Sequence, residues 1–226
     1  MKENICSIPI NDILGPKQGC PICRMFYCLE DKHIEHITGA AMMEPLVRVQ
    51  TNQKGFCRRH LELMNERGNR LSNALVLQTH LQEIAEKFCP DALKGRYNKK
   101  EIEKLQNLQK TCYICERIEK DVAHFFETLF KEYEQNEEFR QLFNEQEYIC
   151  LEHYTVLIEN ATKARIAKKA KEDFMQNVMR LFGGKLQELQ TDIAKFASMF
   201  DYRNSGGDFG TSKDSIERSI KFLGGE

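Results

Sequence analysis

The sequence lacks the features that draw a protein to a membrane or to a highly charged partner. No stretch approaches the roughly 20 consecutive apolar residues of a membrane-spanning helix, and the formal net charge is only −1. Such a balance creates no global attraction to nucleic acid or to anionic lipid. Residues 1–15 hold scattered apolar residues and two acidic ones, without the apolar run of a secretory signal. We therefore expect a cytoplasmic protein with no membrane association, and nucleic acid is not an expected partner.

Catalytic fingerprints and strand patterns are missing too. The sequence contains no phosphate-binding loop, no dinucleotide fingerprint and no evident nucleophile with its base. Apolar residues instead recur at the helical spacings of three and four, at Ile118, Val122, Phe125, Leu129 and Tyr133 and at Leu186, Leu189, Ile193, Phe196 and Phe200. We predict an all-α protein of about eight helices. Breaks are expected at Gly39, Lys54 and Gly55, residues 90–95, Gly183 and Gly184, and residues 204–210.

Cysteine is abundant, with nine residues in 226. In a reducing cytosol, closely paired thiols hold metal more often than they form disulfides. Eight residues form two CxxC and two CxxH elements, and we predict that they are metal ligands: Cys20, Cys23, Cys57, His60, Cys112, Cys115, Cys150 and His153. Cys6, Cys28 and Cys89 fall outside the pattern and are expected to be ordinary core or surface residues.

The four elements repeat at nearly equal intervals. Between the second and third cysteine of each set lie 33 residues in the first half and 34 in the second. Leu46 and Val49 stand at the same offsets before Cys57 as Phe139 and Leu142 do before Cys150. Such self-similarity predicts a duplication. We divide the chain into a first helical unit at 1–93, a second at 94–182 and a C-terminal helical segment at 183–226.

Structural zinc is the metal that best suits this pattern. Four cysteine and histidine ligands complete a tetrahedral shell, and residues at i and i+3 of a helix can aim at one ion. Pro21 suits the first turn of a helix, so each chelating pair is expected at a helix start, where the helix dipole stabilises thiolates. We predict two zinc ions per chain, each held within one half. Another soft-metal centre, such as iron–sulfur, and simple core cysteines remain alternatives.

The chain also resembles a family of bacterial proteins, largely clostridial, that is described only as a domain of unknown function. The resemblance rests on the CPIC, CRRH, CYIC and CLEH elements and on the segment from Asp201 to Asn204 with the amphipathic end that follows it. It covers most of the chain. It implies an intracellular bacterial helical protein and carries no activity.

Three further features have ordinary interpretations that we favour. Glu30 with His33 and Asp121 with His124 have a spacing seen in di-iron bundles but lack companion glutamates. The basic run from Lys163 to Lys171 is typical of a solvated helix. Residues 201–204 are expected to form a turn that ends a helix, with Arg203 paired to a nearby acid.

The leading functional hypothesis is a non-catalytic interaction or regulatory protein with two structural zinc sites and an unidentified protein partner. A thiol-based redox or metal sensor is the first alternative. An enzyme with a pocket between the helical units is the second, and the oligomeric state is left open.

Overall fold

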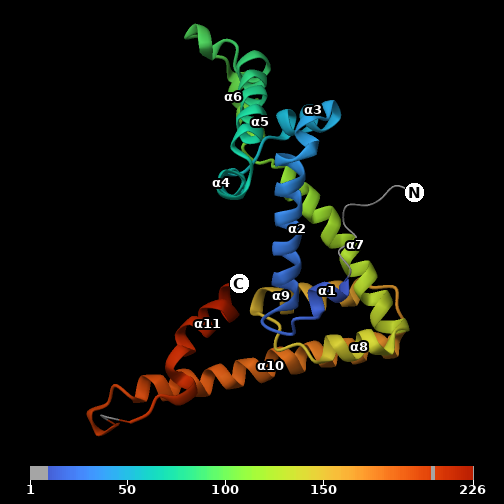
Figure 1. Ribbon diagram of the computed structural model, residues 1–226, viewed down its shortest axis with the longest axis vertical. Helices are drawn as coiled ribbons and strands as arrows, with labels where there is room; N and C mark the ends of the chain where they lie inside the picture. The colour runs from blue at the N-terminus through green and yellow to red at the C-terminus, as the bar shows by residue number, and fades with distance from the viewer. Residues whose placement is uncertain (1–9, 205–206, 226) are drawn as a thin grey trace. The chain divides into compact units, whose positions relative to one another are not determined.

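The computed structural model describes residues 10–204 and 207–225, and these contain eleven α-helices and no β-strand (Figure 1). The all-α prediction is confirmed, whereas the predicted number of helices was too low because short turns divide several periodic stretches. Cys6 lies outside the described residues. The helices are α1 (Ile10–Leu14), α2 (Pro21–Thr38), α3 (Pro45–Lys54), α4 (Arg58–Arg67), α5 (Arg70–Glu83), α6 (Lys99–Leu108), α7 (Tyr113–Gln135), α8 (Glu137–Asn144), α9 (Leu151–Lys163), α10 (Lys168–Ser198) and α11 (Ser215–Gly224). No helix in the described ranges is long and apolar enough to cross a bilayer.

The chain folds into two compact units. Unit 1 contains the residues up to Phe26 and those from Ala123 onward, and unit 2 contains Tyr27–Val122. Helix α2 begins in unit 1 and continues into unit 2, and helix α7 does the reverse. The division at residues 93 and 182 follows the repeat of motifs, and the compact units divide the chain elsewhere.

An aromatic cluster forms the core of unit 1. The rings of Tyr133, Phe143 and Phe174 lie with their centroids 4.9–5.6 Å apart, and all three side chains are fully buried. The Tyr133 hydroxyl donates a hydrogen bond to Asp173 at 2.8 Å and accepts one from Asn177 at 2.9 Å. These partners matter because a buried hydroxyl without a hydrogen bond would lower the free energy of unfolding.

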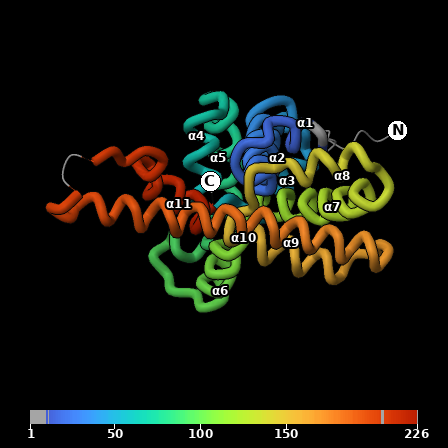
Figure 2. The backbone as a smooth tube through the Cα atoms, turned by 90° about the horizontal axis from the view of Figure 1, so that it is seen from below, coloured from blue at the N-terminus to red at the C-terminus, as the bar shows by residue number. Residues whose placement is uncertain are grey.

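Helix α10 runs without interruption past Gly183 and Gly184, so the break predicted there is wrong (Figures 1 and 2). Packing on both sides offsets the poor helix propensity of two glycines. Phe182 stacks on Tyr154 at 4.2 Å and on Phe222 of α11 at 5.3 Å. Tertiary contacts of this kind readily outweigh about 1 kcal/mol per glycine.

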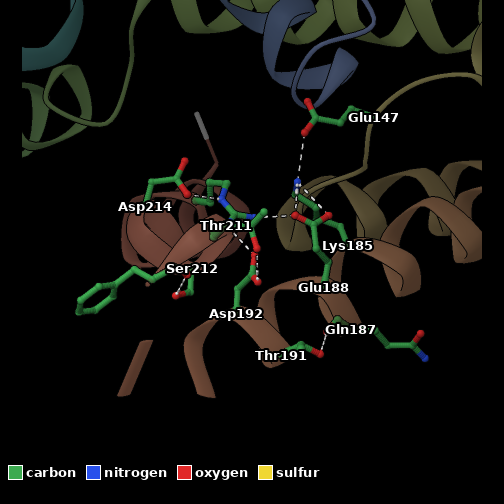
Figure 3. A network of polar contacts seen from close by, with 11 residues as sticks. Glu147, Lys185, Gln187, Glu188, Thr191, Asp192, Thr211, Ser212 and Asp214 are labelled. Carbon is green, nitrogen blue, oxygen red and sulfur yellow. Dashed lines mark hydrogen bonds and ion pairs between the residues drawn. The ribbon is translucent and has the colours of Figure 1, made fainter. Parts of the chain in front are cut away.

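Charged groups tie α11 to α10. Arg218 lies 2.6 Å from Asp192 and 2.5 Å from Glu188. Next to them the buried amine of Lys185 reaches Glu147 at 3.1 Å and Glu188 at 3.2 Å (Figure 3). These two carboxylates compensate for the buried position of the amine.

Unit 2 has a smaller apolar core, in which Val47, Met64 and Val76 are buried. Helix α3 packs on α5, where Arg48 donates to the Leu75 carbonyl at 2.5 Å. The Asn69 side chain caps the start of α5.

The apolar face expected to recur in the two repeats has a different environment in each. Phe139 of α8 is buried, but Leu46 and Val49 of α3 are 79% and 52% exposed. Helix α3 uses Val47 and Thr51 for packing instead.

The continuity of α10 can be tested by replacing Gly184 with alanine. Gly184 is exposed, and no atom lies within 4 Å of the position that a Cβ would occupy. We expect Gly184→Ala to raise the free energy of unfolding by about 0.5–1 kcal/mol, since alanine restricts the unfolded chain and favours the helix. Thermal melting should show an increase of about 1–4 °C.

Gly95→Ala is the matched control. Gly95 has equally open surroundings but a φ of +68°, which penalises any side chain. It should lower the melting temperature, and a decrease for Gly184→Ala as well would show that α10 is broken there.

Candidate metal centres

The two CxxC and two CxxH elements all lie at helix starts, as predicted. Cys20 and Cys112 directly precede α2 and α7, and Cys57 and Cys150 are the N-caps of α4 and α9. The two N-caps have nearly identical backbones, with φ of −72° in both and ψ of 162° and 165°. The first turn then places the partner at i+3 on the same side of the helix as the leading cysteine.

All eight predicted ligands come together, but not in the predicted combination. Two groups form: the Cys150 cluster, with Cys20, Cys23, Cys150 and His153, and the Cys57 cluster, with Cys57, His60, Cys112 and Cys115. Each CxxC pair therefore meets the CxxH pair of the other half, and the prediction that each half closes its own site is wrong. The Cys150 cluster lies entirely in unit 1 and the Cys57 cluster entirely in unit 2.

The course of α2 explains this exchange. Cys23 lies in its first turn, and Glu30, seven residues later, lies beside His60. About 10 Å of helix therefore separates the CxxC element from the CxxH element that follows it in sequence, which is too far for one zinc shell. Equal spacing in the sequence could not reveal this, because it is equally compatible with both pairings.

The distances in both clusters fit a tetrahedral zinc ion. Zinc–sulfur bonds of about 2.3 Å imply sulfur–sulfur edges of about 3.8 Å and sulfur–nitrogen edges of about 3.6 Å. The Cys23 and Cys150 sulfurs are 3.7 Å apart, and those of Cys57 and Cys115 are 3.9 Å apart. Histidine Nδ1 lies 3.1–3.7 Å from the three sulfurs in the Cys150 cluster and 3.2–3.4 Å in the Cys57 cluster. Three sulfurs and one nitrogen would close the shell of each ion.

The thiols of one cluster differ in acidity. Hydrogen bonds from Cys20 and Cys23 lower the pKa of Cys150 to about 3, whereas burial raises the pKa of Cys20 well above its usual value. In the other cluster, burial raises the pKa of Cys115 to about 12. A metal ion would replace the protons that these thiols hold, which is the usual coupling between zinc binding and proton release.

Glu30 is a candidate site residue that the ligand pattern did not identify. Its carboxylate is 5% exposed and lies 3.2 Å from Nε2 of His60, on the side of the ring opposite the thiols. Arg59 holds it with two hydrogen bonds of 2.8 and 2.9 Å. Burial opposes ionisation of Glu30, but the bonds from Arg59 outweigh it and keep its pKa below the usual value. A carboxylate in this position orients a ligating histidine and raises its basicity.

The Cys150 cluster has a different neighbour beside its histidine. The ring of Phe26 stacks on His153 with centroids 5.3 Å apart and planes 21° apart. The two clusters thus contain the same types of ligand, three cysteines and one histidine, but have different neighbouring residues.

The di-iron alternative is not supported. His33 lies 2.6 Å from Asp121, while Glu30 lies beside His60 and His124 is exposed. Among the described residues, only the two cysteine–histidine clusters bring three or more ligand groups together.

The remaining polar features have structural roles. Arg203 pairs with Asp201 at 2.5 Å and Tyr202 is 85% exposed, so this segment forms the predicted turn after α10. The basic run does not form one helix as expected, because α9 ends at Lys163 and α10 begins at Lys168. Lys163 is paired with Glu159 at 2.6 Å.

Replacing Glu30 tests its role beside His60. Glu30→Gln should weaken metal binding at the Cys57 cluster by about 10–100-fold and leave the Cys150 cluster unchanged. Competition with a chromophoric chelator would measure both sites. The control is Glu62→Gln, which removes the exposed carboxylate of a residue in α4. Equal affinities for both variants would contradict the role of Glu30.

Comparisons with known proteins place the chain in a family without supplying an activity. Neither a curated protein nor a solved structure matches it. A family model described as a family of unknown function, DUF6062, matches residues 1–226. Because that match covers the whole sequence, the chain belongs to the DUF6062 family.

Proposed function

We propose that this chain is a zinc protein in which two structural ions hold a helical scaffold for binding another protein. The observation that carries the proposal is the convergence of three cysteines and one histidine twice, at tetrahedral spacing and at the starts of four helices. Iron–sulfur centres usually take four cysteines, and a Cys3His set favours zinc. No disulfide joins the cysteines that the structure describes, in keeping with a cytoplasmic protein.

A structural role suits these sites better than a catalytic one. Four protein ligands leave a zinc ion no position for water or substrate. A pocket of about 730 Å³ in unit 1 is lined by Phe126, Phe130 and several charged residues, and by no cysteine, histidine or serine. We therefore favour a non-catalytic role for the proposed protein.

The two halves are proposed to be copies of one helical unit that exchange their ligands. In each, a CxxC element starts a long helix, a shorter helix follows, and a cysteine N-cap with histidine at i+3 starts the next helix. The matching backbone angles of Cys57 and Cys150 support this relation.

The proposed partner surface is the exposed face of α3, formed by Leu46 and Val49 with the neighbouring Met43. These side chains are 79%, 52% and 72% exposed. The equivalent helix of the other half, α8, packs against the short helix α1, in which Ile13 and Leu14 are buried. By this correspondence we propose that the α3 face binds a short amphipathic helix of a partner protein.

Pairs of substitutions test the exchanged ligand sets. Cys20→Ser with Cys150→Ser alters one cluster, so the double variant should keep one zinc ion per chain. Cys20→Ser with Cys57→Ser alters both clusters and should leave none. Metal analysis of protein purified without added zinc gives the count, and the wild-type protein should contain two.

The outcomes separate the alternatives. Ligand sets confined to each half would reverse the two results, and an absorption spectrum typical of iron would reject zinc. A wild-type protein that binds no metal would overturn the proposed function.

The α3 face can be probed with a photo-crosslinking amino acid. Introduced at position 46, it should form an adduct of one defined mass in living cells, because the apolar face would hold the partner against it. The same group at position 62, on the exposed side of α4, should form none. Equal labelling from both positions would argue against α3 as the interface.

A further inference from the structure

The two metal clusters differ in their exposure to solvent. In the Cys150 cluster the three cysteines are buried, with exposures of 0%, 3% and 0% for Cys20, Cys23 and Cys150. In the Cys57 cluster Cys57 and Cys115 are only half-buried, and Cys112 is 8% exposed. Access to a thiolate sulfur is one of the factors that decide how fast it is oxidised.

Packing around the Cys150 cluster explains its protection. The Phe26 ring covers one face of His153. The end of α11 also reaches the cluster, since a Cβ on Gly225 would lie 3.8 Å from the Cys23 sulfur. Phe222, one turn earlier, is buried and stacks on Phe182, so α11 is anchored there.

The Cys57 cluster has two half-buried cysteines whose sulfurs are already near each other. The Cys57 and Cys115 sulfurs are 3.9 Å apart and come from different helices. A disulfide needs a separation of about 2.05 Å, so a small shift would join them once the metal no longer holds them apart. The Cys23 and Cys150 sulfurs are as close, at 3.7 Å, so the separation alone does not distinguish the clusters.

We propose that the Cys57 cluster is a site of oxidation by hydroperoxides, at which Cys57 and Cys115 form a disulfide and zinc is released, while the Cys150 cluster keeps its metal. The inference rests on the proposed zinc sites and extends them by giving the two ions different roles. One is a permanent structural ion and the other is a regulated one.

The chemistry balances with a hydroperoxide as the oxidant. One thiolate attacks the terminal peroxide oxygen, the O–O bond breaks, and the alkoxide or hydroxide that leaves takes up a proton. The sulfenic acid formed is then attacked by the second thiolate, which makes the S–S bond and expels hydroxide, protonated to water. The two sulfurs together lose two electrons to the peroxide. Zinc then keeps only Cys112 and His60 as ligands and dissociates as Zn²⁺.

The rest of unit 2 can keep its fold during this change. The Tyr113 amide donates to the Gly55 carbonyl at 3.0 Å, and the Thr111 hydroxyl donates to the Lys54 carbonyl at 2.7 Å. These bonds hold the start of α7 against the end of α3 without metal. Oxidation would therefore change the structure only around Cys57, which lies two residues beyond Gly55 at the end of α3.

The test is a titration of zinc-loaded full-length protein with hydrogen peroxide. Zinc release is followed with a chromophoric chelator, and the oxidised cysteines are identified by alkylation and peptide mass spectrometry. One zinc per chain should be released at least about tenfold faster than the other, together with a Cys57–Cys115 disulfide. Reductant and added zinc should restore the starting state.

Variants assign the fast step to its cluster. Cys150→Ser should retain only the rapidly released ion and Cys57→Ser only the slow one. Cys28→Ser with Cys89→Ser, outside both clusters, should behave like the wild type. If a ligand variant does not fold, peptide mapping of the wild-type protein still decides.

Equal release rates, or earlier oxidation of Cys20, Cys23 or Cys150, would overturn the proposal while leaving two structural zinc ions in place. Metal analysis before peroxide is added distinguishes the other failure. Protein that contains no zinc at that stage rejects the zinc assignment, and the oxidation proposal with it.

Discussion

The interaction on which the rest of the structure depends is the meeting of helix starts from opposite halves of the chain around two sets of sulfurs. Each set joins the first turn of a long helix to the first turn of a helix from the other half. The ionised form of these thiols is unfavourable without a cation, since burial is the largest cause of the raised pKa of Cys20 and Cys115. A divalent ion would supply the compensating charge and four directed bonds.

Much of the site could be predicted from the sequence because metal ligation is expressed in local spacing. CxxC and CxxH elements fix which residue types share a helix turn, and Pro21 marks one of the helix starts. The eight cysteine and histidine residues of the two clusters and their helix starts follow from such short-range rules. The pairing of the elements does not, because it depends on which helix starts pack together, and nearly equal spacing in the sequence is compatible with both pairings.

Other differences have the same origin in tertiary contacts. Gly183 and Gly184 have low helix propensity, yet Phe182 stacks on two rings from other helices and α10 continues. Glu30 gave a weak signal as part of a carboxylate-x-x-His pattern. Its position beside His60, which lies 30 residues further along the chain, could only be seen in three dimensions. Local rules predict which groups are available, and packing decides which of them meet.

The exchange of ligands constrains how a chain of this kind could have arisen. A single half holds one CxxC pair and one CxxH pair that belong to different clusters, so it can close neither shell alone. Two separate copies could close both shells, each giving its CxxC to the other's CxxH. The proposed duplication would start from a symmetric, metal-linked homodimer, whose two subunits are joined into one polypeptide through the residues before α6. In such a fused chain the two sites can vary independently, and they differ here in the carboxylate beside one histidine and the phenyl ring beside the other.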